Sequence, residues 1–272
     1  MTTPRPTAPR ATTGRRWLGP ATAALVVAGL GLGGAAVATA AAGTTGEPAG
    51  APAPGATSRP AEPAPDRTPR PAPSRTPTPD ATAVAVAELV DAAWLARTSD
   101  ASGVPATALA AYAGAALRTA EEQPGCHLGW NTLAAIGEVE SAHGTAGGSA
   151  LDAAGLASPP ILGLPLNGSP GRAAVADSDG GALDGDTRWD RAVGPMQFIP
   201  QSWAAWAADG DGDGVSDPQN VHDAALAAAR YLCDSGDLAD PDTWIAAVAA
   251  YNDDLAYNNA VADVADRFAG LG

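Results

Sequence analysis

A change in composition near residue 80 limits what this chain can fold into. The first 79 residues are mostly Ala, Pro, Thr, Gly and Arg, and apart from Trp17 every Trp, Tyr, Phe, Cys and His of the 272-residue chain lies beyond them. A stable domain needs large apolar side chains to bury, and only the C-terminal part supplies them. The sequence therefore predicts one folded domain over residues 81–272, long enough for a single hydrophobic core.

Residues 1–46 have the pattern of a signal peptide or an N-terminal membrane anchor. Four Arg residues precede an uncharged stretch over residues 17–46 whose centre is apolar. The small residues Ala38, Thr39 and Ala40 offer a cleavage site, yet the stretch is also about long enough to span a bilayer. Both interpretations stay open and predict export of the domain. A third interpretation is a buried core helix. It is disfavoured because no amphipathic segment adjoins the stretch.

Residues 47–80 alternate Pro with Ala, Thr, Ser and Arg. Pro is excluded from regular helix and sheet, and the segment has no large apolar side chains to bury. It is predicted to be a disordered, extended linker.

The charge balance changes at the same boundary. Before Asp80 the chain has 8 Arg and 3 acidic residues, and from Asp80 onward it has 7 Arg and 27 acidic residues. A strongly acidic surface repels phosphates, so we exclude nucleic acid as a partner. Neutral sugar polymers and cations suit this surface better.

Beyond residue 80 the apolar residues recur with helical spacing, which predicts a mainly α domain. A long loop rich in Gly, Pro and Asp is expected over residues 144–192, and few segments alternate as strands. Asp223 is expected to cap the helix that follows the last Asp-rich segment. Helices are expected around residues 86–94, from Pro105 past Leu117, over 131–141, 200–206, 223–233 and 241–251, and at the end of the chain.

Two acids, Glu138 and Glu140, lie in the helix predicted over residues 131–141. Glu140 shares a face with the apolar residues Leu133 and Ile136, because side chains three and four apart lie on one side of a helix. A carboxylate at the end of an apolar stripe is partly desolvated, which raises its pKa and suits a general acid. Glu138 falls on the opposite side and fits a solvated position. By spacing alone, Glu140 at the margin of a solvated face remains an alternative.

Three ordered segments carry a family resemblance. They are Ile-Gly-Glu-Val-Glu-Ser-Ala-His-Gly over residues 136–144, Ala-Val-Gly-Pro-Met-Gln-Phe-Ile-Pro over residues 192–200, and Ala-Tyr-Asn over residues 250–252 with Tyr257. Over roughly residues 101–268 the chain resembles the lytic murein transglycosylases of the membrane-bound B type, with a lysozyme-like SLT-type domain. The resemblance is closest to their actinobacterial branch.

The resemblance implies a helical fold like goose-type lysozyme, with a substrate cleft. It also implies cleavage of the MurNAc-GlcNAc β-1,4 bond in peptidoglycan glycan strands, with 1,6-anhydro-MurNAc ends as products and Glu140 as the sole general acid and base. The protein would act in the cell envelope, either secreted or anchored to the outer face of the cytoplasmic membrane. A monomer without an organic cofactor is expected.

The resemblance also assigns substrate-binding residues. Where the family has Tyr-Asn-x-Ser, this chain has Asp254 in the place of Ser, which puts the contacts around this motif in doubt. For Met196 and Phe198, plain core packing is the alternative. The expected substrate-binding residues are Ser141, Gly194, Met196, Gln197, Phe198, Tyr251, Asn252 and Tyr257.

Two other functions stay open. A lysozyme-like hydrolase would need a second carboxylate, which the long loop offers. A catalytically silent peptidoglycan-binding module would keep the groove without cleavage, although the intact Glu140 argues against it. The candidate second carboxylates are Asp177, Asp179, Asp184, Asp186 and Asp190.

Residues 209–220 resemble a calcium loop of EF-hand type. Acids alternate along it and Gly214 stands at the sixth position, but Asn220 occupies the twelfth, where a bidentate Glu is expected. A structural Ca²⁺ is therefore predicted, and a merely solvated loop is the alternative. The expected ligands are Asp209, Asp211, Asp213, the carbonyl of Val215, Asp217 and Asn220.

The two cysteines, Cys126 and Cys233, are expected to form a disulfide because the chain is predicted to be exported. Two free thiols are the alternative. His127, His143 and His222 show no metal-ligand spacing and are interpreted as ordinary polar residues, with His143 near enough to Glu140 to affect it.

Overall fold

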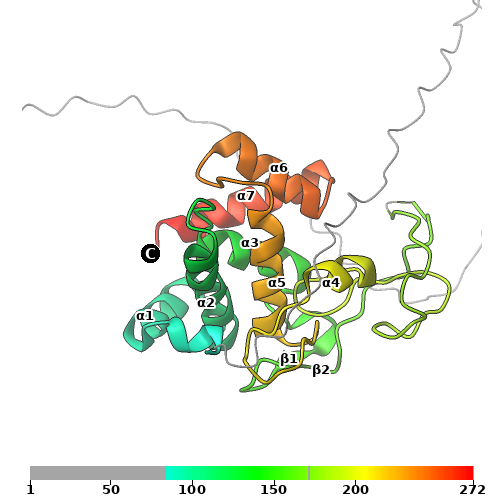
Figure 1. Ribbon diagram of the computed structural model, residues 1–272, viewed down its shortest axis with the longest axis horizontal. Helices are drawn as coiled ribbons and strands as arrows, with labels where there is room; N and C mark the ends of the chain where they lie inside the picture. Colours follow the sequence, from blue (N-terminus) through cyan, green and yellow to red (C-terminus); the bar gives the residue numbers. More distant parts are fainter. Residues whose placement is uncertain (1–83, 171, 272) are drawn as a thin grey trace, which may run out of the picture. The chain divides into compact units, whose positions relative to one another are not determined.

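The helices that the apolar spacing predicts are present in the computed structural model, which describes residues 84–170 and 172–271 (Figure 1). The mainly helical class is confirmed. The predicted signal or anchor over 1–46 and the linker over 47–80 lie outside the described residues. Among the helices of the described part, none is long and apolar enough to cross a membrane.

Seven α-helices, two short 3-10 helices and one antiparallel strand pair occur in the described part. The strands pair Ala150 with Ser158 and Leu151 with Ala157. In chain order the elements are η1 (Val86–Leu89), α1 (Ala92–Ser102), α2 (Ala106–Glu122), α3 (Trp130–Ser141), η2 (Ala146–Gly148), β1 (Ala150–Leu151), β2 (Ala157–Ser158), α4 (Pro200–Trp206), α5 (Val221–Cys233), α6 (Pro241–Tyr251) and α7 (Leu255–Ala269).

The first predicted helix is in fact two elements, η1 and α1. Asp91 between them has extended backbone, and its side chain accepts a hydrogen bond of 2.7 Å from the amide of Trp94. That is the geometry of a helix N-cap, so a new helix begins after Asp91. The apolar spacing continues across the break and therefore does not reveal it.

The prediction that Asp223 caps α5 is wrong. Asn220 is the N-cap, and its side-chain oxygen accepts a hydrogen bond of 2.9 Å from the amide of His222. Both Asn and Asp can cap a helix, and the helix begins two residues earlier than the apolar spacing indicates. Asp223 therefore lies in the first turn, where it takes a different role described below.

Helix α2 lies at the centre of the core and packs against α5, α3, α1 and η1. Its side chains Leu109 and Tyr112 are fully buried. Gly137 of α3 meets α2 so closely that a Cβ at this position would overlap the Tyr112 hydroxyl group. This contact brings the helix that contains Glu140 directly onto the central helix.

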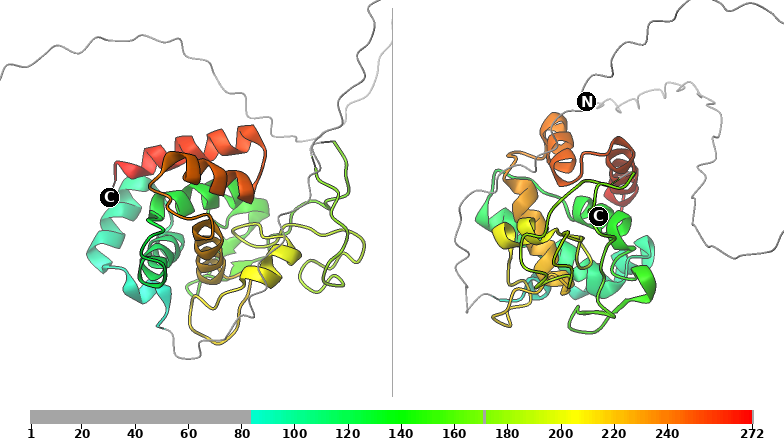
Figure 2. Two further views of the ribbon diagram at one scale, coloured as in Figure 1. Left: turned by 45° about the horizontal axis from the view of Figure 1, so that its top comes forward. Right: turned by 90° about the vertical axis from the view of Figure 1, so that its right-hand side faces the viewer.

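Helix α7 packs along α3, and α6 packs on α7. Figure 2 shows α6 and α7 together at one end of the helical domain, beside α3. Residues near the C-terminus are thereby placed next to the end of α3, more than a hundred positions away in sequence.

The predicted loop over residues 144–192 contains η2 and the small hairpin, and its yellow-green part projects to one side of the helices (Figure 1). Isolated bridges pair Leu162 with Val193 and Ala176 with Trp189. The loop is thus folded back on itself by backbone hydrogen bonds.

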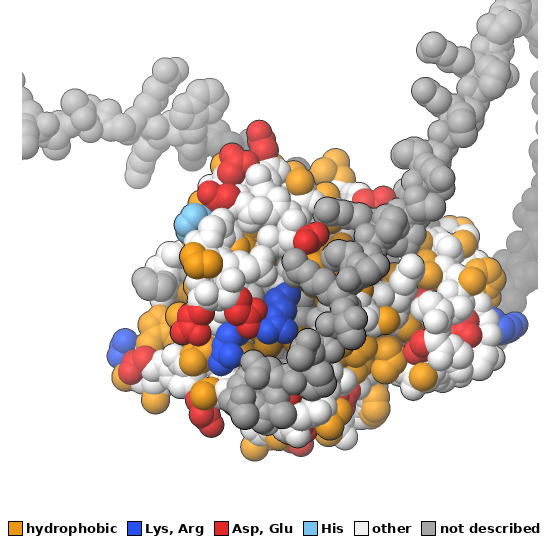
Figure 3. Space-filling model, viewed as in Figure 1, with side chains coloured by type: hydrophobic (Ala, Val, Ile, Leu, Met, Phe, Trp, Pro, Cys, Tyr) orange, Lys and Arg blue, Asp and Glu red, His pale blue; other side chains and the backbone are white. Residues whose placement is uncertain are grey.

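The two cysteines are joined: Cys126, in the loop before α3, forms a disulfide with Cys233 at the end of α5. Beside it, the amide of Leu238 donates a hydrogen bond of 2.7 Å to the carbonyl of Cys126. The segment that leads into α3 is therefore tied to the end of α5 by the disulfide and to the loop after α5 by the backbone contact. On the face shown in Figure 3, acidic side chains are spread widely with only a few Arg side chains among them.

Candidate active site

Glu140 lies in the last turn of α3, at the end of the buried stripe that the sequence predicts. Leu133 and Ile136 on this face are fully buried, and Glu140 itself is half-buried. The hydroxyl group of Tyr257, in the first turns of α7, donates a hydrogen bond of 2.7 Å to Oε1 of Glu140. Among residues 84–170 and 172–271 this is the one hydrogen bond that the carboxylate accepts. Its second oxygen is therefore available for chemistry.

Burial raises the pKa of Glu140 to about 7, and the hydrogen bond from Tyr257 opposes part of that rise. Desolvation disfavours the charged form of a carboxylate, whereas a donated hydrogen bond favours it. Near neutral pH, protonated and ionised forms of Glu140 are both populated. A group in this state can give and take a proton at the same pH.

Residues 193–198 form a tight turn beside the end of α3, which we call the 193–198 turn. Val193 and Phe198 exchange two backbone hydrogen bonds of 2.8 and 3.0 Å across it. Gly194 has a φ of 76°, and a side chain there would overlap the carbonyl oxygen of Pro218. Gly is thus required both by the backbone conformation and by the close approach.

Ser141 connects this turn to α3. Its buried hydroxyl group donates a hydrogen bond of 2.6 Å to the carbonyl of Pro195 and accepts one of 2.8 Å from the amide of Gly144. The residue next to Glu140 is therefore fixed to the 193–198 turn. Ser141, predicted to bind substrate, has its hydroxyl group engaged by the protein.

The other residues of the turn divide between core and surface. Met196 is fully buried, and Phe198 packs edge-to-face on Trp203 and Tyr251 with ring centroids 5.4 and 5.8 Å apart. Gln197 is half-buried, has a φ of 48°, and donates a hydrogen bond of 3.0 Å from its side-chain nitrogen to the carbonyl of Gly194. Among the predicted substrate-binding residues of the 193–198 turn, Gln197 is the one with a partly exposed polar side chain.

The Tyr-Asn motif, Tyr251 and Asn252, connects the end of α6 to the 193–198 turn. The hydroxyl group of Tyr251 donates a hydrogen bond of 2.7 Å to the carbonyl of Met196. Burial and the nearby Glu140 raise the pKa of Tyr251 well above its ordinary value. The exposed Asn252 accepts a hydrogen bond of 3.1 Å from the amide of Asp254. The predicted residues Glu140, Ser141, Tyr251 and Tyr257 are thus brought together around the 193–198 turn.

Asp254, which stands where the family has Ser, is the N-cap of α7. Its carboxylate accepts a hydrogen bond of 2.9 Å from the amide of Tyr257. Asp and Ser both cap helices well, so the exchange keeps this contact. The cap fixes the start of the helix that presents the Tyr257 hydroxyl group to Glu140.

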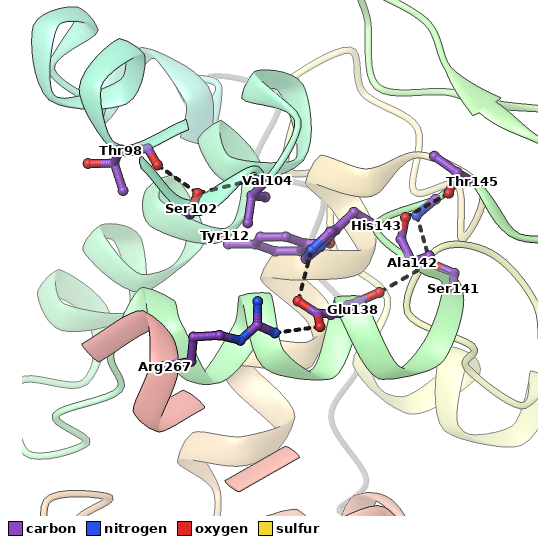
Figure 4. A network of polar contacts seen from close by, with 12 residues as sticks. Thr98, Ser102, Val104, Tyr112, Glu138, Ser141, Ala142, His143, Thr145 and Arg267 are labelled. Atoms are coloured by element: carbon purple, nitrogen blue, oxygen red, sulfur yellow. Dashed lines mark hydrogen bonds and ion pairs between the residues drawn. The ribbon is translucent and has the colours of Figure 1, made fainter. Parts of the chain in front are cut away.

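Glu138 has partners that its predicted solvated position did not suggest. Figure 4 shows its carboxylate between Arg267 of α7 and His143, with N···O distances of 2.5 Å and 3.6 Å. The other ring nitrogen of His143 lies 3.4 Å from the Tyr112 hydroxyl group. Burial lowers the pKa of His143, and Glu138 opposes this effect. His143 therefore contacts Glu138, and this network fixes the end of α3 against α2 and α7.

The acidic loop, residues 209–220, brings together the first three predicted ligands. Asp209, Asp211 and Asp213 each offer a carboxylate oxygen within 4.8 Å of the others. Burial and the two neighbouring carboxylates raise the pKa of Asp211. Hydrogen bonds to its carboxylate oppose part of this rise. Asn220 directs its amide nitrogen to Asp211 at 2.6 Å while its oxygen caps α5. Oxygen donors crowded in this way suit a hard cation such as Ca²⁺.

Asp223, in the first turn of α5, binds backbone amides of the acidic loop. Its buried carboxylate accepts hydrogen bonds from the amides of Gly210, Asp211 and Asp217, at 2.7, 3.2 and 2.8 Å. Burial raises the pKa of Asp223 to about 7, against these hydrogen bonds. Sequence reasoning missed this role and that of Arg267. The signal that could have found Asp223 is a lone acid just after a Gly-rich loop.

The five acids of the long loop accept hydrogen bonds from their own loop. Asp177 and Asp179 together accept six amide hydrogen bonds from residues 179–183. Asp190 is fully buried and holds the amide and hydroxyl groups of Ser178. Asp184 accepts the amides of Asp186 and Arg191, and Asp186 pairs with the Arg191 side chain. These carboxylates hold the loop in shape.

Comparison with known proteins adds one relationship. A family model described as Transglycosylase SLT domain matches residues 181–262. The match spans less than a third of the 272-residue chain, and it includes the 193–198 turn, the acidic loop, Tyr251 and Tyr257 but not Glu140. No curated protein and no solved structure matches the chain significantly. The match supports a lytic transglycosylase-like family and hence an enzyme that acts on peptidoglycan, outside the cytoplasm.

Proposed function

We propose that this protein is a peptidoglycan lytic transglycosylase that cleaves the MurNAc-GlcNAc β-1,4 bond and leaves 1,6-anhydro-MurNAc ends. Glu140 is its sole general acid and base. The observation that supports this most is the half-buried carboxyl group of Glu140, with a pKa raised to about 7 and, within the described part of the chain, a single hydrogen bond, from Tyr257. It lies beside a turn that belongs to the matched transglycosylase segment.

The chemistry requires one carboxyl group that works twice. Protonated Glu140 donates its proton to the glycosidic oxygen as the bond from that oxygen to C1 of the muramic residue breaks. The N-acetyl group of the substrate stabilises the positive charge at C1. The Glu140 carboxylate then takes the proton of the 6-hydroxyl group, whose oxygen bonds to C1 and closes the anhydro ring. Glu140 ends protonated as it began, and no water is consumed.

The surroundings of the loop acids favour this route over a lysozyme-like hydrolase. Hydrolysis with two carboxyl groups needs a second carboxylate facing the sugar. Asp177, Asp179 and Asp190 accept hydrogen bonds from backbone amides and from the Ser178 hydroxyl group. Asp184 accepts a hydrogen bond from the backbone amide of Arg191, and Asp186 accepts one from its guanidinium group. A carboxylate that already accepts several hydrogen bonds is a weak base.

The acidic loop is proposed to hold a structural Ca²⁺. Asp209, Asp211 and Asp213 would supply carboxylate oxygens and Val215 its carbonyl. The ion would offset the mutual repulsion of these acids. Asp217 and Asn220 would complete the set of ligands. Asn220 already uses both atoms of its side-chain amide, in contacts with Asp211 and with the amide of His222.

The remaining parts of the proposal concern location and assembly. The protein acts as a monomer in the cell envelope, secreted or anchored to the outer face of the cytoplasmic membrane through residues 1–46. Its partners are glycan strands, and it uses no organic cofactor. The apolar N-terminal stretch and the excess of acids over Arg beyond residue 80 support this placement.

Mass spectrometry of muropeptides tests the reaction. Purified peptidoglycan digested by the wild-type protein should yield products that end in anhydro sugars, one water lighter than hydrolysis products. Digestion that gives only hydrated reducing ends would identify a hydrolase. Binding to peptidoglycan without any release of muropeptides would identify a silent binding module.

A further inference from the structure

The exit of the acidic loop lies against the 193–198 turn. Pro218 is buried, and its carbonyl oxygen is so close to Gly194 that a side chain at 194 would overlap it. Two segments that the sequence separates by more than twenty residues are therefore in direct backbone contact.

Gln219, the next residue, binds Ile161 of the long loop through both the oxygen and the nitrogen of its side-chain amide. Its oxygen accepts a hydrogen bond of 2.9 Å from the amide of Ile161, and its nitrogen donates one of 3.0 Å to the carbonyl of Ile161. A side chain that satisfies both backbone groups of one residue acts like a short piece of β-sheet pairing. Ile161 is thus fixed relative to the acidic loop.

Ile161 in turn holds the 193–198 turn. Its carbonyl also accepts a hydrogen bond of 2.9 Å from the amide of Gly194, and the next residue, Leu162, forms a bridge with Val193. On the other side, the amide of Gln219 donates a hydrogen bond of 2.8 Å to Asp217. A continuous chain of contacts runs from Asp217 through Gln219 and Ile161 to Gly194.

We propose that Gln219 is a positioning residue that holds the 193–198 turn in place through Ile161 and so couples the acidic loop to the turn beside Glu140. Gln219 does not touch Glu140. Its effect on a sugar substrate rests on the proposed function, in which this turn faces the glycan strand. Its effect on the turn itself does not depend on any activity.

Hydrogen exchange measured by mass spectrometry tests the coupling directly. The variant Gln219→Met keeps the length of the side chain and removes both hydrogen bonds. Amides of residues 193–198 should exchange about thirtyfold faster in the variant, the factor expected for losing two hydrogen bonds of ordinary strength. The control is Gln123→Met, at the end of α2, whose side chain makes no hydrogen bond within the described ranges.

Two outcomes of the exchange experiment would overturn the proposal. One is unchanged exchange over residues 193–198 in folded Gln219→Met. The other is an equal increase in the peptides of α2, because that would mean that Gln219 supports the whole domain. Exchange that rises at the turn while α2 stays protected supports the proposal.

Steady-state cleavage of soluble glycan strands gives the second readout. Gln219→Met should raise KM about fivefold or more with kcat nearly unchanged, since the proton-transfer group is not altered. A fall in kcat at constant KM would contradict the positioning role. If wild-type protein cleaves nothing, the proposed function fails, while the exchange result still decides whether Gln219 holds the turn.

Discussion

The carboxyl groups of the half-buried Glu140 on α3 and the buried Asp223 on α5 both have a pKa raised to about 7 by burial. Their surroundings differ. Asp223 accepts three backbone amides with its two oxygens, whereas Glu140 accepts one hydroxyl group and, among the described residues, leaves its second oxygen without a hydrogen-bond partner. A shifted pKa alone therefore does not identify a catalytic acid. The open hydrogen-bonding capacity of Glu140 separates the two roles.

The largest expected effect is a loss of peptidoglycan cleavage on substitution of Glu140, which is not expected for Asp223. Glu140→Gln should reduce peptidoglycan cleavage by at least about 10³-fold, because the amide has the same shape but cannot transfer the proton in either step. Release of muropeptides measures it, with circular dichroism as a check on folding. Glu138→Gln, two residues away, should keep most of the activity because its carboxylate pairs with Arg267 and His143. Wild-type cleavage by Glu140→Gln would remove Glu140 from the mechanism.

Asp223→Asn should act on stability. Its one remaining oxygen cannot accept all three amides, and its NH₂ group would face N–H donors, so unfolding free energy should fall by about 2 to 3 kcal/mol. Urea denaturation measures this. The exposed Asp242→Asn in α6 is the matched control and should change little. An Asp223→Asn protein as stable as the wild type would show that the three amide contacts contribute nothing.

Removal of calcium should affect the acidic loop more than the Glu140 site. A ligand that binds only the folded state at about 100 times its Kd adds roughly 2.7 kcal/mol of stability. Added Ca²⁺ should therefore raise the melting temperature of chelator-treated protein, and Asp211→Asn should abolish this response. Asp179→Asn should retain it, because Asp179 lies in the long loop, where its carboxylate clusters with those of Asp177 and Asp190. If Asp179→Asn loses the rise in melting temperature with Ca²⁺ and Asp211→Asn keeps it, the cation binds in the long loop and not in the acidic loop.

Glu140 should also have a measurable effect on stability that depends on pH. Its pKa in the folded protein, about 7, is raised above the ordinary value of 4.5. The stability that it contributes is fully present below the unfolded pKa and is lost as pH rises through the folded pKa. Glu140→Gln removes this dependence, so its melting temperature should exceed that of the wild type by a few degrees at pH 8 and match it near pH 4. Equal differences at both pH values would contradict the raised pKa.

The smallest expected effect comes from the partner of Glu140. Tyr257→Phe removes the hydrogen bond that lowers the Glu140 pKa, so that pKa should rise further. Because the acid must be protonated for the first step, the alkaline limb of the pH–rate profile should move to higher pH, with kcat lower by about tenfold. Tyr231→Phe, whose hydroxyl group binds the carbonyl of Ala250, is the control and should leave the limb in place.

The sequence by itself determined the helical class, the bounds of α4 and α6, and the apolar stripe that ends at Glu140. These depend on local spacing and on Pro at the first helical position, which act within a few residues. The pairing of Cys126 with Cys233 also followed from the sequence, because the chain has two cysteines.

Only the tertiary structure decided which groups meet around Glu140 and in the acidic loop. The Tyr257 hydroxyl group, the Arg267 partner of Glu138 and the Gln219 contact with Ile161 join residues between 58 and 129 positions apart. Local spacing does not determine such contacts, because they depend on how α7 packs on α3 and how the long loop folds back on itself. The role of Asp223 was likewise hidden, since capping a helix and accepting loop amides require the same residue type at nearly the same position.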